Sequence, residues 1–245
     1  MLPQIGFGTY RLKDCTDIVK YAINSGYKLV DTAELYKNEE HVSKALSKDI
    51  FLTTKISPKS ITKGLIRKSV EERLKLFGKI DLLLLHKPSD NCDKDWEELV
   101  ELYEENDKIL NIGVSNFKIV DLEKIVSSKV QPFCNQIEVT PFLLRDKLVK
   151  YCQEKKIKIV AHSSLTKGEK LDNKTLVEIG KKYKKTPAQI LLRWGIQKGF
   201  TVLPRSSCPK HVKENMNIFD FEINDKDMCL LDSLNEGYST HPNLI

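Results

Sequence analysis

Short apolar segments alternate with segments of helical period along the whole chain, and this alternation limits the fold more than any other feature of the sequence. The apolar segments are short enough to predict strands. They lie at residues 5–9, 27–31, 50–55, 80–85, 109–114, 133–137, 157–161 and 200–203. All but one are followed promptly by a helical segment. Eight βα units in 245 residues predict an α/β protein: a (β/α)8 TIM barrel with short βα loops.

The helical segments place apolar residues on one face, as Val42, Ala45 and Leu46 show. We expect helices at residues 16–24, 38–47, 61–76, 96–105, 118–127, 145–154, 172–183 and 209–215. A further helix is expected to start at Pro187, because Thr186 is a good helix cap and proline suits the first helical turn.

A doubly wound nucleotide-binding sheet is the alternative fold. Such a sheet usually carries a GxGxxG turn between its first strand and the helix that follows. Residues 6–10 lack the third glycine of that motif and have no helix directly behind them. The barrel is therefore favoured. No linker or change in composition divides the chain, so we expect a single domain over residues 1–245.

Charge and hydropathy exclude several classes of protein. The 40 lysines and arginines and the 34 aspartates and glutamates give a net charge of +6, but the two signs are interleaved along the chain. This pattern does not indicate a nucleic-acid partner. The longest apolar runs, such as residues 80–85, are far shorter than the roughly 20 residues that a membrane span requires, so we expect no membrane partner.

Six cysteines lie far apart and include no CxxC pair. We therefore expect free thiols, without a metal site or a redox couple. Residues 1–8 show no basic cluster followed by an apolar stretch, so we also expect no secretory signal and a cytoplasmic protein.

Polar residues stand where the predicted strands end. In a TIM barrel, these ends point into the mouth that carries the catalytic groups. The candidates are Asp31, Lys55, His86, Ser115, Asn116, Gln136, His162, Ser163 and Arg205, with Tyr36 on the loop after Asp31. An aspartate, a tyrosine, a lysine and a histidine that meet in one mouth form a set suited to proton transfer.

Each of these four residues has an ordinary structural explanation when it is taken alone. Asp31 suits a turn cap, Tyr36 a packed aromatic, Lys55 a solvated charge and His86 a histidine near the core. If all four residues were only structural, four unrelated explanations would have to coincide at the same face of the same barrel. Their joint placement therefore favours an active site.

Several segments resemble motifs of the aldo-keto reductase family, in the order in which that family carries them. Residues 26–39 resemble its Asp and Tyr motif, 51–55 its catalytic lysine strand, 81–88 its histidine strand and 112–117 its amide-binding turn. Further matches lie at residues 135–138, 186–190 and 203–206. The resemblance covers nearly the whole length. It implies a TIM barrel that binds NAD(P)H across its C-terminal face.

The resemblance also implies the roles of the four catalytic candidates. Tyr36 is expected to be the general acid, Lys55 the cation that lowers its pKa, Asp31 the partner of Lys55, and His86 a donor to the carbonyl. The chemistry agrees, since a tyrosine with a pKa of about 10 is a weak acid near neutral pH and a nearby ammonium favours its phenolate.

The expected cofactor is NADPH, with NADH as the alternative. Ser115, Asn116 and Gln136 resemble the ligands of the nicotinamide carboxamide, and Arg205 and Ser206 the site of the 2′-phosphate. The full set of expected cofactor contacts is Thr9, Asp31, Ser115, Asn116, Gln136, His162, Ser163, Leu165, Arg205, Ser206, His211, Glu214 and Asn215.

Three positions depart from the family pattern. His162 stands where a tyrosine usually stacks on the nicotinamide, Lys87 replaces a common tryptophan, and His211 replaces an arginine near the 2′-phosphate. A titrating His162 is expected to weaken binding of oxidised cofactor as the pH falls; the alternative is a histidine that a partner holds neutral or that is turned away from the nicotinamide ring. Brief loops after the fourth and seventh strands, and no long C-terminal loop, predict an open substrate pocket.

The leading functional hypothesis is reduction of small aldehydes or ketones to alcohols by a monomeric NADPH-dependent enzyme. The alternative of the same fold is a catalytically quiet protein that binds NAD(P)H and acts in interaction or redox sensing. A sugar-phosphate enzyme is a third hypothesis, but residues 163–168 and 205–207 lack the glycine-rich phosphate loop that it predicts.

Overall fold

Eight parallel strands form one curled sheet in the order of the sequence, in a computed structural model that describes residues 1–244. The strands are β1 (Phe7–Gly8), β2 (Leu29–Asp31), β3 (Phe51–Ile56), β4 (Leu82–Leu85), β5 (Ile112–Ser115), β6 (Cys134–Glu138), β7 (Lys158–His162) and β8 (Thr201–Val202). The sheet closes on itself, because Ile5 pairs with Val202 and the Gly6 amide donates to the Val202 carbonyl at 2.9 Å. The predicted (β/α)8 barrel is confirmed.

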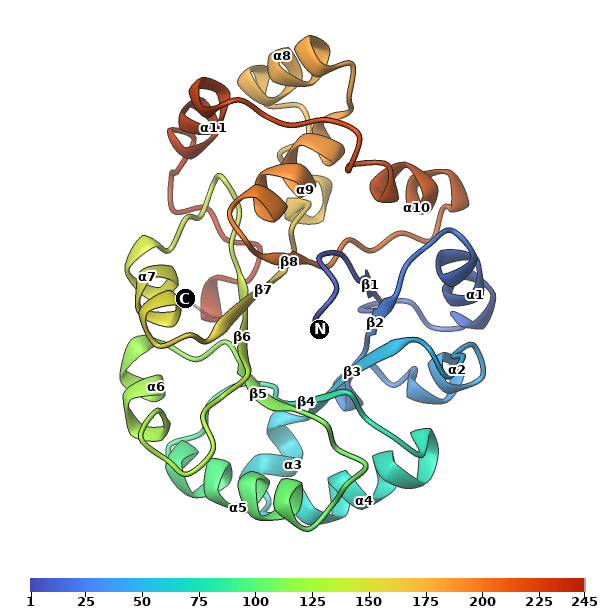
Figure 1. The fold of residues 1–245 in the computed structure, drawn as a ribbon, viewed down its shortest axis with the longest axis vertical. Helices are drawn as coiled ribbons and strands as arrows, with labels where there is room; N and C mark the ends of the chain where they lie inside the picture. The colour runs from blue at the N-terminus through green and yellow to red at the C-terminus, as the bar shows by residue number, and fades with distance from the viewer. Residues whose placement is uncertain (245) are drawn as a thin grey trace.

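Helices surround the strands on all sides (Figure 1). They are α1 (Thr16–Asn24), α2 (Glu39–Ser43), α3 (Pro58–Thr62), α4 (Ile66–Phe77), α5 (Cys92–Glu104), α6 (Ile119–Ile125), α7 (Asp146–Glu154), α8 (Lys174–Tyr183), α9 (Pro187–Gln197), α10 (Pro209–Met216) and α11 (Asp225–Asp232). Thr186 caps α9 as predicted, with its hydroxyl accepting from the Gln189 amide. The helix α11 was not predicted from the sequence.

One predicted helix, at residues 61–76, is two helices in the structure. Ser57 caps α3 through the amide of Ser60, and Pro58 occupies its first turn. Gly64 then adopts a φ of +63°, which a right-handed helix does not allow, and α4 begins two residues later. The predicted helix at 38–47 is also shorter, since α2 covers only Glu39–Ser43.

Apolar side chains form two clusters. The larger one lies between the strands and the surrounding helices, and it includes the fully buried Trp96 and Trp194. The smaller one gathers side chains from the strands and from the residue after β8, and its buried members are Leu29, Leu82, Leu84, Cys134, Val160 and Leu203. Gly6 lies against it, where a Cβ atom would come within 2.1 Å of Leu29 Cδ2. A glycine is therefore required at that position.

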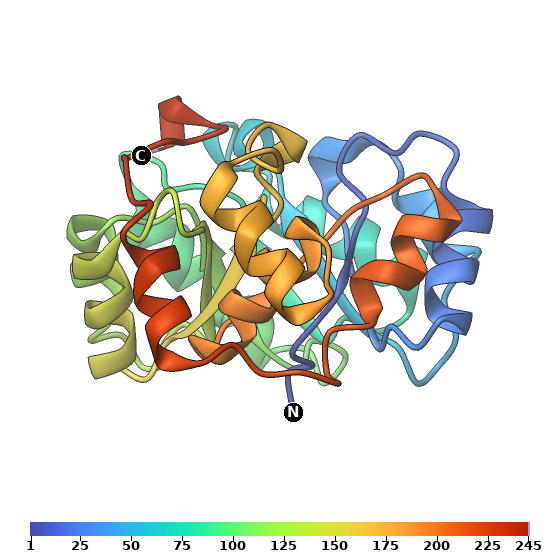
Figure 2. The same ribbon diagram turned by 90° about the horizontal axis from the view of Figure 1, so that it is seen from above.

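The two ends of the barrel differ. Figure 2 shows the N-terminus at one end and the last described residues at the opposite end. There, after α11, the chain returns to the end of β6, where the Thr240 amide donates to Glu138 Oε1 at 2.9 Å. No helix within residues 1–244 is long and apolar enough to cross a membrane.

Candidate active site

Alternation along each strand explains why polar groups gather at this end of the barrel. Side chains two residues apart lie on the same face of a strand. Leu29, Cys134 and Val160 belong to the smaller apolar cluster. Two residues further along β2, β6 and β7 stand Asp31, Gln136 and His162, which line a cleft. On this face of β2, β6 and β7, the earlier residue is therefore apolar and the residue two positions later is polar.

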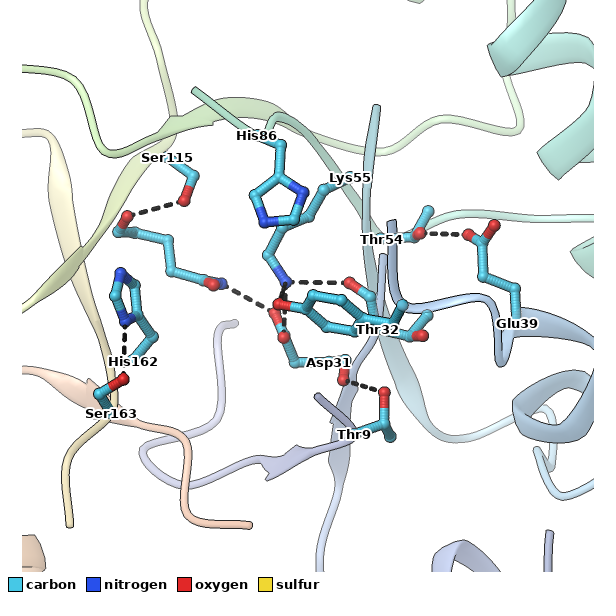
Figure 3. A network of polar contacts seen from close by, with 12 residues as sticks. Thr9, Asp31, Thr32, Glu39, Thr54, Lys55, His86, Ser115, His162 and Ser163 are labelled. Atoms are coloured by element: carbon cyan, nitrogen blue, oxygen red, sulfur yellow. Dashed lines mark hydrogen bonds and ion pairs between the residues drawn. The ribbon is translucent and has the colours of Figure 1, made fainter. Parts of the chain in front are cut away.

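Lys55 is the centre of the polar layer. Its Nζ donates to Asp31 Oδ1 at 2.6 Å, to the Thr32 carbonyl at 2.9 Å and to Tyr36 Oη at 3.3 Å. Its side chain is 0% exposed and that of Asp31 is 4% exposed. Figure 3 shows the side chains of Asp31 and His86 beside the Lys55 ammonium. The four catalytic candidates therefore come together, as predicted.

The charge of Lys55 is held by its partners. Burial alone would lower the pKa of Lys55, but Asp31 and Tyr36 together outweigh burial and raise it. The other oxygen of Asp31 accepts from Gln136 Nε2 at 2.8 Å. Both oxygens of this buried carboxylate therefore have hydrogen-bond donors.

The net pKa shift of Tyr36 is opposite to the lowering that we expect from Lys55. Burial raises the pKa of Tyr36, and the opposing effect of the Lys55 ammonium is smaller than that of burial. The phenol therefore keeps its proton at neutral pH. Without Lys55 its pKa rises further, so the direction of the predicted lysine effect holds although the net shift is upward.

His86 lies beside the phenol, with the two rings edge to face at a centroid distance of 5.7 Å. Burial, together with the Lys55 charge, holds the pKa of His86 well below its usual value, so the imidazole is neutral. Its Nδ1 is buried and has no hydrogen-bond partner among the described residues. Its Nε2 also has no hydrogen-bond partner among residues 1–244, so Nε2 is the ring nitrogen left for a ligand in the cleft that His86 lines.

Polar side chains from β5 and β6 form the next part of the cleft. The Ser115 hydroxyl donates to the Gln136 carbonyl at 2.9 Å, and Asn116 Nδ2 donates to the His86 carbonyl at 3.1 Å. Asn116 has a φ of +60°, a left-handed conformation that asparagine tolerates better than most residues. These contacts fix the Asn116 amide beside His86, while the Gln136 amide is held by Asp31.

His162 makes a contact that the sequence did not indicate. Its Nε2 lies 2.9 Å from Asn116 Oδ1, and its Nδ1 lies 3.2 Å from the Ser163 hydroxyl. Burial lowers the pKa of His162 to about 3, against the opposing charge of Glu138. The expected titration near neutral pH is therefore wrong, and the alternative of a histidine held neutral by partners agrees with the structure.

The cleft has a volume of about 740 Å³ and extends from Tyr36 to the start of α10. All but one of the expected cofactor contacts line it, namely Asp31, Ser115, Asn116, Gln136, His162, Ser163, Leu165, Arg205, Ser206, His211, Glu214 and Asn215. Thr9 is the exception. It is fully buried and its hydroxyl donates to the Asp31 carbonyl, so its side chain supports Asp31 instead of facing the cleft (Figure 3).

The C-terminal segment also reaches the cleft, a contribution that was not predicted from the sequence. Glu138 at the end of β6 accepts from the Ser239 hydroxyl at 2.6 Å and from the Thr240 hydroxyl at 2.6 Å. These bonds bring His241 and Leu244 to the wall of the cleft. The sequence signal for this was Glu138, a carboxylate two residues beyond Gln136 on the same face of β6.

A buried ion-pair network holds the loop that carries Tyr36. Glu34 accepts from the Ser57 amide at 2.8 Å and the Ser60 hydroxyl at 2.6 Å. Arg73 of α4 donates to Glu39 at 2.8 Å and lies 3.7 Å from Glu34. Glu39 also accepts from Thr54, the neighbour of Lys55 (Figure 3). The network therefore fixes the segment that contains Tyr36 against β3 and α4.

Comparison with known proteins agrees with this geometry. Residues 4–236 match the sequence model of the aldo/keto reductase family. The chain is 37% identical to a glyoxal reductase of Bacillus subtilis, over 99% of this chain and 92% of that protein. It is 36% identical to a 9,11-endoperoxide prostaglandin H2 reductase of Trypanosoma cruzi, over 96% of this chain and 88% of that protein.

A solved structure is similar over nearly its whole length. It is that of an aldo-keto reductase enzyme from a Medee basin deep-sea metagenome library, with a TM-score of 0.93 and 34% sequence identity. The alignment covers 98% of this chain and 93% of that chain.

Proposed function

The chain belongs to the aldo/keto reductase family and is an NAD(P)H-dependent oxidoreductase. From this premise we propose that it reduces small aldehydes and ketones to alcohols with NADPH, and that Tyr36 is the general acid. The observation that carries the proposal is the 3.3 Å contact between Lys55 Nζ and Tyr36 Oη at the wall of the cleft. A phenol in contact with a buried ammonium can release its proton, because the ammonium stabilises the phenolate left behind.

The cleft fits a dinucleotide. Its volume of about 740 Å³ lies within the range of small-molecule sites. Amide and hydroxyl groups of Ser115, Asn116 and Gln136 at one end suit a carboxamide. At the other end, the cleft is lined by Arg205 and Ser206, which precede α10, and by His211 in its first turn, where helix N–H groups favour an anion.

When bound, the nicotinamide supplies a hydride for the carbonyl carbon. The protein residues then act on the carbonyl oxygen. Tyr36 donates a hydrogen bond to this oxygen and transfers its proton as negative charge develops there. His86, neutral and partly unpartnered, donates a second hydrogen bond. Lys55 stabilises the tyrosinate, and Asp31 keeps Lys55 positioned and charged.

Two measurements test the proposal: NADPH consumption with a panel of small aldehydes and ketones, and NADPH binding followed by fluorescence. We expect both binding and turnover. Binding without turnover of any carbonyl compound would support the catalytically quiet alternative. Failure to bind either nicotinamide cofactor would reject both functions.

We expect Arg205 to provide most of the preference for NADPH over NADH. Arg205 is exposed at the wall of the cleft, where its guanidinium can pair with a 2′-phosphate. A charge-assisted hydrogen bond contributes about 1.5 to 3 kcal/mol, or about 10- to 150-fold in affinity. Arg205→Ala should raise the Kd of NADPH by this factor and leave that of NADH nearly unchanged, as measured by fluorescence titration. An unchanged ratio of the two constants would remove Arg205 from the phosphate site.

We expect the rate of carbonyl reduction to be constant between pH 6 and pH 8. The folded-state pKa of His86 lies well below 6.5 and that of His162 is about 3, so both imidazoles are neutral throughout this range. The pKa of Tyr36 is raised above 10, so the phenol stays protonated. The pH profile of kcat/KM and the ratio of the Kd values of NADP+ and NADPH test this. An inflection near pH 6.5 in either would show that a histidine titrates at the site.

A further inference from the structure

One end of the cleft is surrounded by five rings, each in contact with the next. The centroid distances are 5.7 Å from His86 to Tyr36, 5.1 Å from Tyr36 to Tyr10, 6.2 Å from Tyr10 to His241 and 5.6 Å from His241 to His162. Asn116 closes the circle, because it is hydrogen-bonded both to the His162 ring and to the His86 carbonyl. We call this set the ring collar: His86, Tyr36, Tyr10, His241, His162 and Asn116.

Two members of the ring collar, Tyr10 and His241, have no role in the proposed reaction, and of these His241 carries the ring nitrogens. Its side chain is 24% exposed. Its Nδ1 faces other protein groups: the Thr240 hydroxyl at 3.0 Å, the Ser163 hydroxyl at 3.5 Å and Glu138 Oε2 at 3.7 Å. Its Nε2 has no hydrogen-bond partner among residues 1–244. One nitrogen is thus committed to holding the ring, and the other is available to a ligand.

The hydrogen bonds of Thr240 decide which nitrogen carries the proton. The Thr240 hydroxyl donates to Glu138 Oε1 at 2.6 Å, so it can only accept from His241 Nδ1. Nδ1 therefore carries hydrogen, and Nε2 of the neutral ring is a hydrogen-bond acceptor. In an imidazolium, Nε2 is a donor. A hydroxyl group both donates and accepts, so it can pair with Nε2 in either state.

Glu138 fixes the position of this ring. Although burial opposes it, hydrogen bonds from Ser239 and Thr240 and the nearby His241 lower the pKa of Glu138 to about 2. The carboxylate is therefore ionised at any physiological pH. It anchors three consecutive residues of the C-terminal segment to the end of β6, so His241 is held in place without a bound ligand.

We propose that His241 is a specificity-determining residue that binds a hydroxyl group of the substrate through Nε2, and that the enzyme accordingly prefers hydroxyaldehydes to the corresponding plain aldehydes. The proposal rests on the reduction of carbonyl compounds at Tyr36. In the ring collar a single ring, Tyr10, separates His241 from Tyr36. A short substrate whose carbonyl lies at Tyr36 can therefore present a second polar group to His241. Leu35 and Leu244 supply apolar contacts to its carbon chain.

The test compares kcat/KM for 2-hydroxypropanal and 3-hydroxypropanal with kcat/KM for propanal. The ratio of hydroxyaldehyde to plain aldehyde is measured in the wild type and in each variant, so differences in the intrinsic reactivity of the aldehydes cancel. His241→Phe keeps a ring but removes Nε2, and we expect the ratio to fall about 3- to 10-fold for at least one hydroxyaldehyde. His241→Gln places an amide near the position of Nε2 and should retain most of the preference.

Tyr238→Phe is the matched control. It removes a hydroxyl from the same segment, one that bonds Glu169 and does not line the cleft. Its ratio should equal that of the wild type. A wild-type ratio in His241→Phe, or equal losses in the Phe and Gln variants, overturns the proposal for His241. If the wild type does not reduce propanal or either hydroxyaldehyde, the proposed function itself fails, which is a separate result.

Discussion

Replacement of Tyr36 by phenylalanine is expected to reduce kcat for carbonyl reduction by about 100-fold or more while the Kd of NADPH changes little. The reason is the position of the hydroxyl. Tyr36 Oη lies at the cleft 3.3 Å from Lys55 Nζ, and the substitution removes the proton donor without removing a charged group. Stopped-flow measurement of NADPH oxidation gives the rate, and fluorescence titration gives the affinity.

The phenylalanine ring preserves the contacts of the tyrosine ring with Tyr10 and His86, so the variant also serves as a test of the acid alone. A variant with near wild-type turnover would assign the proton to another donor, with Lys55 and His86 as the candidates. A large loss of NADPH affinity would instead indicate that Tyr36 supports the cofactor site.

Replacement of Lys55 by methionine should abolish activity and destabilise the fold. Lys55 and Asp31 form an ion pair of 2.6 Å with almost no exposure to water. Removal of one partner of such a pair leaves a buried uncompensated charge, which typically costs about 3 to 5 kcal/mol. Activity is lost as well, since the tyrosinate formed by proton transfer loses its stabilising cation. Urea unfolding and the NADPH assay measure the two effects separately.

A double variant separates stability from catalysis. Lys55→Met combined with Asp31→Asn removes both charges and leaves an amide that Gln136 can still contact. We expect the double variant to recover much of the lost free energy of unfolding, because no unpaired charge remains, and to stay inactive. Recovery of activity together with stability would mean that Lys55 has only a structural role.

The sequence predicted the barrel and the catalytic cluster because both depend on short-range patterns. A polar residue at the end of an apolar strand, as at Asp31 or Gln136, lies in the mouth of any such barrel. Tyr36 could be placed because it follows Asp31 by five residues on the same loop. The two segments α3 and α4 could not be separated in advance, since the break depends on the backbone conformation of Gly64.

Long-range contacts escaped prediction for a different reason. Glu138 and Thr240 are 102 residues apart, and no periodicity links them. The direction of the Tyr36 shift depends on how far burial outweighs the charge of Lys55, which only the packed structure shows. The contact between His162 and Asn116 likewise depends on side-chain orientation within the mouth. The sequence therefore identified the site residues Tyr36 and His162, but it did not predict their contacts or the direction of their pKa shifts.

The buried network around Arg73 has a consequence for protein engineering and for the evolution of this chain. Arg73 belongs to α4, while both of its carboxylate partners, Glu34 and Glu39, flank Tyr36 on a different βα unit. Loss of Arg73 leaves two carboxylates without their counter-charge, and loss of Glu39 leaves Arg73 with only the more distant Glu34. Chimeras that exchange single βα units between homologues are therefore expected to fail at this junction. The smallest exchangeable module runs from the loop after β2 through α4, and neutral replacement of Arg73 requires a compensating change at its carboxylate partners.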